Sequence, residues 1–260
     1  MYIKTSIPDK LPLTRLKWPA LIPLLGEANR VLGRFEEILK NTPNRSVVLL
    51  PLTLQEAKDT YKAQARATPL EIQKCLKALG LTKHKKIRPL SPSFLKQVHA
   101  LMTDRESGYI RKRQNWIGPT GCRMEEAFCY PPASRYVSTY LKRLENYAET
   151  ADGDPVIQTS IAFAQFLVIH PFMDGNGRVA RLLLPLLLYK KGVTSEPLFY
   201  MSAYFQKHRK EYFDRLLALS KDHDWEGWIS FFLKGVIAQG KLLCKKAEKL
   251  KSSPRTSKSR

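Results

Sequence analysis

Residues 170–181 bring together residue types that bind a phosphate group and act on it. Gly175 and Gly177 permit backbone conformations that point successive N–H groups inward, which builds a nest for an anion. A helix predicted to begin near Asn176 would add the positive end of its dipole and its free N–H groups. The backbone of this segment therefore predicts a phosphate-binding loop at the start of a helix.

Four side chains of the same segment supply matching chemistry. Arg178 and Arg181 are three residues apart, so both project from one side of the first helical turn and can fork onto phosphate oxygens. Asp174 offers the hard oxygen ligand that Mg²⁺ accepts when the ion is also bound to phosphates. His170 ends the preceding apolar helix, and an imidazole with an ordinary pKa of about 6.5 suits proton abstraction at neutral pH. These side chains predict a nucleotide site with His170 as its base.

Taken singly, each feature has an ordinary structural explanation. A histidine after an apolar helix is usually structural, a Gly-Asn-Gly sequence is usually a turn, and arginines on a helix usually face solvent. By uniform composition, such a set of residue types within one short segment would occur by chance on the order of once in a billion chains of this length. The combination therefore indicates a functional site.

The same residues match the motif of the Fic family, H-P-F-x-D/E-G-N-G-R-x-x-R, at every defined position. The chain thus resembles Fic proteins, and the likeness extends over about residues 10–240. The other segments that resemble the family are 26–33, 108–118, 130–132, 198–204 and 211–213. The resemblance implies an all-α, Fic-fold helical bundle with a small β-hairpin flap and an N-terminal helical module.

The activity implied by the resemblance is that of a protein adenylyltransferase, which moves AMP from ATP onto a Ser, Thr or Tyr hydroxyl of a target protein. ATP with Mg²⁺ would lie over the loop, with the metal on Asp174. His170 would take the hydroxyl proton, the oxygen would attack the α-phosphorus, and pyrophosphate would leave. The implied nucleotide-binding residues are Asp174, Gly175, Asn176, Gly177, Arg178 and Arg181. Tyr212 and Phe213 are candidates for the adenine pocket, with plain helix core as an equal alternative.

The resemblance also implies that the flap, roughly residues 116–130, pairs with an extended target segment by strand addition. Its backbone would hold the target hydroxyl near His170. The expected target-binding residues are Trp116, Ile117, Gly118, Ala127 and Phe128.

Many relatives with the N-terminal module carry an inhibitory helix, S/T-x-x-x-E-G/N, whose Glu pairs with the second Arg of the motif. The comparable segment here begins at Thr60 within residues 56–65, and Gln64 stands in the position of the Glu. A neutral amide cannot make a charge-assisted bidentate pair with Arg181. We therefore hypothesise that autoinhibition is weak or absent; the alternative is that this helix is structural and regulation lies in a separate chain.

Helical periodicity of apolar residues dominates the long segments of the chain. Helices are predicted from residue 18 to about 40 and over 54–65, 69–80, 91–101, 133–149, 155–169, 176–191, 204–220 and 225–243. Residues 106–132 lack this periodicity and predict a loop or a short hairpin. The expected organisation is an N-terminal helical module over 1–85, a catalytic core over 86–243 and a basic, disordered tail over 244–260.

The chain has 44 basic and 23 acidic residues among 260, a formal net charge of +21. This excess favours anionic partners, so an acidic protein or nucleic acid bound through the basic tail is considered, alongside a merely solubilising tail. The four cysteines show no metal-ligand spacing, which favours a reduced, cytoplasmic protein, and delivery of a bacterial effector into a host is an alternative location. The longest apolar run, 182–188, is too short to span a bilayer.

Two rival functions stay open at this point. The first is another Fic-type transfer, of UMP, phosphocholine or phosphate, or the removal of AMP. The second is a basic nucleic-acid-associated protein with a vestigial nucleotide site. No helix-turn-helix or aromatic-basic pattern stands out in the sequence to favour the second.

Overall fold

The longest apolar stretches of the chain form two central helices in the computed structural model, α6 (Pro155–Ile169) and α7 (Asn176–Lys190). Every residue of α6 from Val156 to Ile169 is buried, which is expected for a helix whose residues are mostly apolar and surrounded by other helices. Asp154 caps α6 because its carboxylate accepts the N–H groups of Val156 and Ile157. The predicted phosphate loop is the short connection between these two helices.

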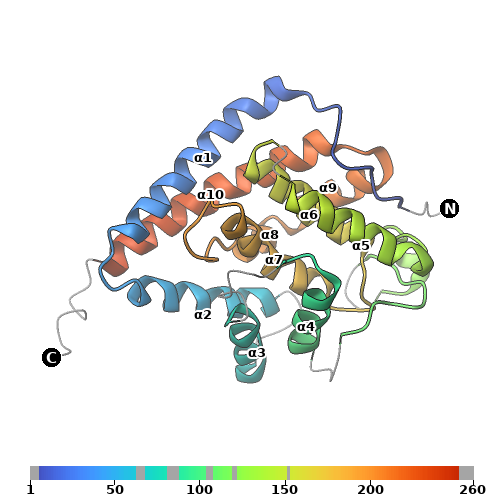
Figure 1. Cartoon of the computed structure of the whole chain (residues 1–260), viewed down its shortest axis with the longest axis horizontal. Coiled ribbons are helices and arrows are strands. Elements are labelled where there is room, and N and C mark those ends of the chain that lie inside the picture. Colours follow the sequence, from blue (N-terminus) through green and yellow to red (C-terminus); the bar gives the residue numbers. More distant parts are fainter. Residues whose placement is uncertain are drawn as a thin grey trace.

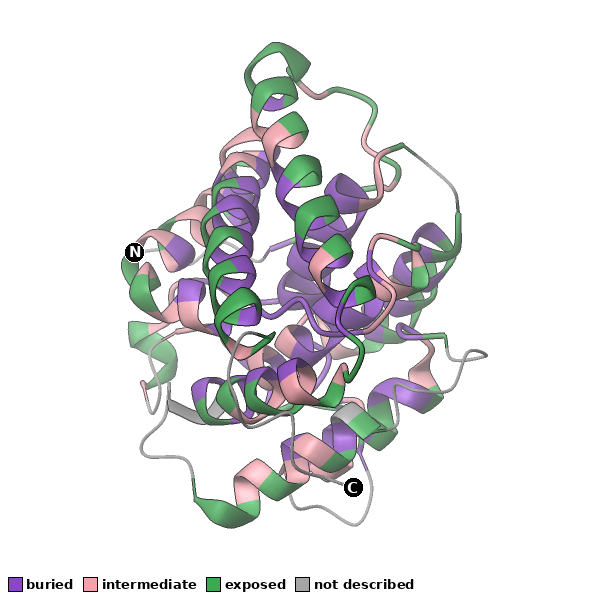
Figure 2. Cartoon of the chain, turned by 90° about the vertical axis from the view of Figure 1, so that its left-hand side faces the viewer, coloured by how far each residue is buried: buried purple, intermediate pink, exposed green. Residues whose placement is uncertain are grey.

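The structure describes residues 6–62, 68–80, 88–103, 108–118, 122–150 and 153–251. The other helices within these ranges are α1 (Trp18–Lys40), α2 (Ser46–Lys62), α3 (Pro69–Gly80), α4 (Pro92–Thr103), α5 (Ser134–Glu149), α8 (Ser202–Lys207), α9 (Arg209–Asp222) and α10 (Trp225–Lys251). Figure 1 shows them arranged around α6 and α7, and Figure 2 shows their buried residues turned toward the interior. The prediction of a mostly helical fold is confirmed. No described helix combines the length and apolar character needed to cross a membrane.

The long helices α1 and α10 lie side by side along one edge of the molecule (Figure 1). Gly240 allows their close approach, since a Cβ at this position would lie 2.3 Å from Val31 Cγ1. The prediction that a disordered tail begins at residue 244 is wrong for residues 244–251, which continue α10. Cys244 is buried on α1, and Glu248 pairs with Arg34 at 3.0 Å, so tertiary contacts extend the helix. Residues 252–260 of the predicted tail lie outside the described residues.

Two further helix predictions need correction. The helix expected over 54–65 begins earlier, at Ser46, and is described to Lys62. The helix expected over 204–220 is divided at His208, whose φ of −107° and ψ of 35° leave the helical region. This break starts α9 anew, just before Tyr212 and Phe213.

The flap is less regular than predicted. Among its described residues, the sheet-like pairing is one antiparallel bridge between Ile117 and Cys129, and a 3₁₀ turn at Met124–Glu126 lies between these two residues in the chain. The Ile117 N–H donates to the Cys129 carbonyl at 3.0 Å, and the Phe128 N–H donates to the Ile117 carbonyl at 2.8 Å. A β-hairpin with named strands is therefore not seen in the described part of the flap.

Candidate active site

The loop between α6 and α7 turns through two residues in the left-handed region. His170 ends α6 with a φ of 49°, and Gly175 precedes α7 with a φ of 79°. A left-handed conformation is uncommon for a residue with a side chain, and such residues concentrate at functional sites. Gly175 is also required sterically, because a Cβ there would lie 2.8 Å from Thr103 Cγ2.

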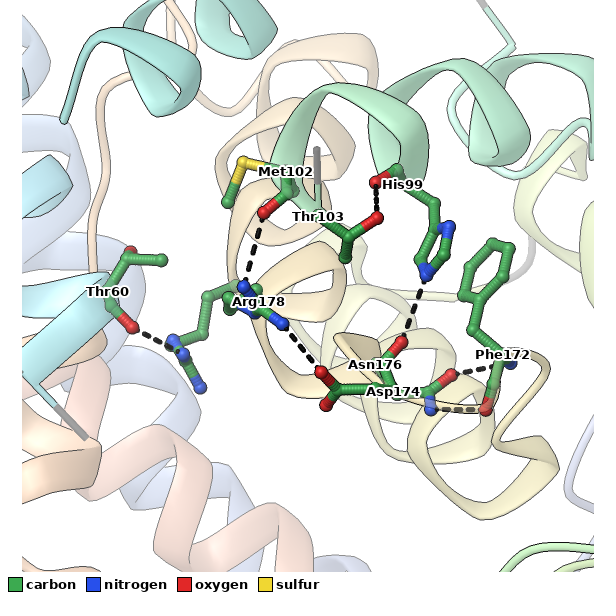
Figure 3. A network of polar contacts seen from close by, with 9 residues as sticks. Thr60, His99, Met102, Thr103, Phe172, Asp174, Asn176 and Arg178 are labelled. Atoms are coloured by element: carbon green, nitrogen blue, oxygen red, sulfur yellow. Dashed lines mark hydrogen bonds and ion pairs between the residues drawn. The ribbon is translucent and has the colours of Figure 1, made fainter. Parts of the chain in front are cut away.

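Asn176 and Phe172 brace the loop from within. The Asn176 side chain accepts the Phe172 N–H at 2.9 Å and donates to the Phe172 carbonyl at 2.8 Å (Figure 3). The Phe172 ring is fully buried and stacks on His99, with ring centroids 3.9 Å apart. His99 Nε2 in turn lies 3.0 Å from the Asp174 carbonyl oxygen. Since its amide is engaged inside the loop, Asn176 would contact a phosphate through its backbone N–H.

Arg111 holds the same loop from the outside. Its guanidinium donates to the carbonyls of His170 at 2.8 Å and Ile169 at 3.4 Å, and also to the Pro132 carbonyl. Its backbone N–H donates to the Pro171 carbonyl at 2.9 Å. Burial lowers the pKa of Arg111 to about 10, which leaves it charged at neutral pH. Sequence reasoning missed this role, and the only available signal was its place within residues 108–118.

His170 is held as a neutral imidazole with one nitrogen left for chemistry. Its Nδ1 lies 3.1 Å from the Leu167 carbonyl, which can only accept, so Nδ1 carries the hydrogen and Nε2 keeps its lone pair. Part of the His170 side chain faces the cleft, yet burial lowers its pKa to about 4. The positive charge of Arg111 lowers this pKa further, whereas the Leu167 carbonyl and the negative charge of Asp174 raise it. The imidazole can therefore accept a proton at neutral pH.

Asp174 and Arg178 pair with each other at the start of α7. Arg178 Nη2 lies 2.9 Å from Asp174 Oδ2, and Arg178 Nη1 donates to the Met102 carbonyl at 3.2 Å (Figure 3). No group of three or more His, Cys, Asp or Glu side chains that could hold a metal occurs among the described residues. One exposed carboxylate beside a phosphate nest fits Mg²⁺, because this ion keeps waters and takes further ligands from substrate phosphates.

Arg181 contacts α2 at Thr60, the first residue of the segment that resembles the inhibitory helix, through a backbone carbonyl. Arg181 Nη2 donates to the Thr60 carbonyl at 2.8 Å, and burial lowers the pKa of the guanidinium. An acidic side chain of α2, Glu56, is buried nearby and accepts hydrogen bonds from Ser202 and from Thr60 Oγ1. Burial raises the pKa of Glu56 to about 7, with Arg181 opposing the shift. Gln64 lies outside the described residues.

One cleft of about 420 Å³ unites nearly all of the predicted site residues. It is lined by His170, Asp174, Gly175, Asn176, Gly177, Arg178, Arg181, Tyr212 and Phe213, and by Trp116, Ile117, Gly118 and Phe128 of the flap. Ala127 is not among the lining residues. The flap closes over α9 where the Phe128 and Phe213 rings lie 5.7 Å apart.

The adenine-pocket candidates differ in exposure. Tyr212 is 8% exposed and packs against Phe205 and Trp228, so most of its ring belongs to the core. Phe213 is half-buried at the cleft, and the Arg209 guanidinium lies 5.2 Å from its ring centroid. Arg209 lines the cleft as well, and sequence reasoning did not single it out.

We compared the sequence and the fold of the chain with those of known proteins. Residues 89–188 match the model of the Fic/DOC family. Residues 89–188 are thus a Fic/DOC region of the chain. Relatives of the chain include protein adenylyltransferase fic-1 of Caenorhabditis elegans, 34% identical over 90 residues, which are 34% of this chain and 16% of that protein. Protein adenylyltransferase Fic of Drosophila mojavensis is 26% identical over 129 residues, or 48% of this chain and 22% of that protein.

Solved structures show the same fold. The chain resembles a Fic family protein from Desulfovibrio desulfuricans G20 with a TM-score of 0.71 and 20% identity, over 89% of this chain and 75% of that one. It also resembles Fic-1 of C. elegans with a TM-score of 0.58 and 17% identity, over 88% and 73% of the two chains. The matched parts span less than a quarter of the curated relatives' length.

Proposed function

We propose that this protein is a protein adenylyltransferase, which transfers AMP from ATP to a Ser, Thr or Tyr hydroxyl of a target protein and releases pyrophosphate. The observation that carries the proposal is the neutral His170, whose Nε2 is left as an acceptor in the same cleft as the Gly175–Gly177 nest and two arginines. The names of the curated relatives support the same activity.

The nucleotide would be bound mainly through its phosphates. The first turn of α7 has N–H groups without intrahelical partners, and Asn176 and Gly177 of this turn line the cleft. Arg178 would exchange its pairing with Asp174 for a phosphate oxygen, since both partners of that pair reach the cleft. Asp174 would hold Mg²⁺, which when bound offsets charge on the phosphates. Phe213 is the more accessible of the two aromatic candidates for the base.

His170 would remove the proton from the target hydroxyl. As the proton passes to Nε2, the hydroxyl oxygen forms a bond to the α-phosphorus and the bond to the pyrophosphate oxygen breaks. Protein contributions to such transfers come from positioning and charge stabilisation, which the loop and its arginines supply. Arg111 and Leu167 would keep the imidazole oriented while it gains the proton.

The flap would position the target by backbone pairing. Its Ile117–Cys129 bridge already has sheet geometry, and Trp116, Ile117, Gly118 and Phe128 line the cleft. An extended target segment added to this edge would bring a hydroxyl toward His170.

Weakened autoinhibition is part of the proposal. Arg181 is held by the Thr60 carbonyl, which is a neutral acceptor, and a bond to a neutral group is roughly half as strong as one to a carboxylate. A γ-phosphate could therefore displace α2 from this guanidinium. Gln64→Glu combined with Ala65→Gly should then suppress transfer, and unchanged transfer in this double variant would remove this part of the proposal.

The decisive assay incubates the protein and a His170→Ala variant with a cell lysate and labelled donors. We expect label from α-labelled ATP on discrete protein bands, and loss of this label in the variant. Label from UTP or CDP-choline instead would reassign the donor while keeping a Fic-type transfer. No label from any donor would overturn the transferase proposal.

A further inference from the structure

The outer face of α5 carries two tyrosines in contact with each other, each of which also contacts an arginine. The Arg135 guanidinium lies 4.8 Å from the Tyr136 ring centroid, and the Arg143 guanidinium lies 5.8 Å from that of Tyr140. The two tyrosine rings meet edge to face, with centroids 6.5 Å apart. Tyr136 is 47% exposed. We call these four side chains, Arg135, Tyr136, Tyr140 and Arg143, the α5 ladder.

The α5 ladder lacks the acidic partners that surface arginines commonly have. Among the described residues, neither Arg135 nor Arg143 forms an ion pair. The two glutamates of α5 are already engaged: Glu145 lies 3.0 Å from Lys142 and 3.4 Å from Arg88, and Glu149 lies 3.7 Å from Arg88. The positive charge of the ladder is therefore not neutralised within the described chain.

More positive charge lies at the start of α5. Lys112 and Arg113 are exposed, and the Ser134 hydroxyl donates to the Lys112 carbonyl at 3.0 Å. The same stretch leads directly to Asn115 and Trp116 of the cleft, and α5 begins four residues after the flap ends at Tyr130. The ladder is thus continuous with the segments that frame the cleft, and Figure 1 shows α5 on the outside of the molecule beside α6.

The chemistry of the ladder favours carboxylates over nucleic acid bases. Guanidinium groups already lie over the tyrosine rings, so a base would have to displace them in order to stack. A guanidinium presents a planar fork that matches a carboxylate, and packing on an aromatic ring restricts its motion, which lowers the entropy cost of binding. Arg143 comes eight positions after Arg135 in the helix, a rise of about 12 Å, or about four residues of an extended chain.

We propose that the α5 ladder docks an extended, acidic segment of the target protein, with two carboxylates about four residues apart. The role as target docking site rests on the proposed function, whereas binding of the acidic segment does not. The positive charge of this protein would then serve recognition through α5, in addition to any role of its C-terminal residues.

The test measures binding of a fluorescent Gly/Ser peptide that carries two Glu residues four positions apart, by fluorescence anisotropy without nucleotide. The proteins compared are the His170→Ala background, the same protein with Arg135→Gln and Arg143→Gln, and a charge-matched control with Arg30→Gln and Lys245→Gln on the α1–α10 edge. We expect the ladder variant to bind about tenfold more weakly, since each exposed charged contact contributes up to a few-fold. The control should bind within about twofold of the parent, because the loss of two distant charges acts only through screened, long-range attraction.

Three results would overturn the inference: no binding of the peptide, equal weakening in the ladder variant and the control, or tighter, ladder-dependent binding of an oligo-dT strand of equal charge. Each of these leaves AMP transfer untested, because the His170→Ala background lacks it. Conversely, a failure of the labelling assay with intact peptide binding would sink the proposed function and leave the acidic docking site standing. Thermal unfolding of all three proteins shows whether the exposed substitutions leave the fold intact.

Discussion

Replacement of Arg111 by Met should damage both the stability and the activity of this protein. The guanidinium donates to the carbonyls of His170, Ile169 and Pro132, and Met offers no donor in its place. Leaving a buried acceptor unsatisfied costs at least about 1 kcal/mol, so three such carbonyls give about 3 kcal/mol. For a chain of this size, that loss corresponds to a fall in melting temperature of roughly 6–12 °C.

The effect of Arg111→Met on catalysis should exceed its effect on the folded fraction. Arg111 bonds the carbonyl of His170 itself, and a displacement of a reacting group by about 1 Å can cost roughly 10²-fold in rate. The assay is AMP transfer measured at a temperature well below the unfolding transition, with urea unfolding measured on the same preparation. The adjacent Lys112→Met serves as the matched control, because Lys112 is exposed.

Arg111→Lys should give an intermediate result, since an ammonium keeps the charge but cannot reach three carbonyls in a planar fork. If Arg111→Met melts and transfers AMP like the Lys112→Met control, the reasoning about the loop is refuted. A loss of stability with normal transfer by the folded protein would refute only the positioning role.

Three further predictions follow from single residues. Burial disfavours the charged form of Glu56 and raises its pKa to about 7. The free energy of unfolding should therefore fall by up to about 3 kcal/mol as pH rises from about 4.5 through 7. In urea unfolding measured at several pH values, Glu56→Gln should remove most of this pH dependence, and an unchanged pH dependence in the variant would contradict the assigned burial. Gly175→Ala should lower the melting temperature more than Gly192→Ala, because both have a positive φ but only the first places a Cβ within 2.8 Å of another side chain; equal shifts would refute the steric argument. The pKa of His170, about 4, predicts that the rate of AMP transfer stays constant from pH 8 to about 5.5 and declines only below this range, as the imidazole gains its proton. A decline in this rate centred at pH 6.5 would contradict the lowered pKa, because about 6.5 is the value of an imidazole in water.

The phosphate loop and the helices beside it could be predicted from the sequence because their determinants are local. The start of α6 is marked by Asp154 and Pro155, and both glycines of the nest lie within the loop itself. The side-chain spacing that places Arg178 and Arg181 on one side of α7 follows from helix geometry alone.

Features that depend on distant parts of the chain could not be predicted. Nothing near Cys244 shows that α1 covers it, and this contact is what continues α10 to Lys251. Arg111 is one of many basic residues, and its role depends on carbonyls 21 to 59 positions away. Glu56 was passed over because its burial against Ser202 is set by the packing of α2 on α8.

The α5 ladder is a different case, since its members are close in sequence. Tyr136, Tyr140 and Arg143 have helical spacing, so their shared face could have been anticipated. What the sequence lacked was the evidence that Glu145 and Glu149 are engaged by Arg88, which leaves the arginines of the ladder without acidic partners. The many basic residues near the C-terminus had instead suggested that an acidic partner would bind there.

The most direct test of the central claim compares ATP labelled at the α-phosphate with ATP labelled at the γ-phosphate, using the native protein and His170→Ala with a lysate. Transfer of AMP predicts label on protein from the α-phosphate alone, and a loss of about 10²–10⁴-fold in the rate when His170 is replaced. Label from the γ-phosphate alone, or α-label that persists at the same rate without His170, would contradict the account.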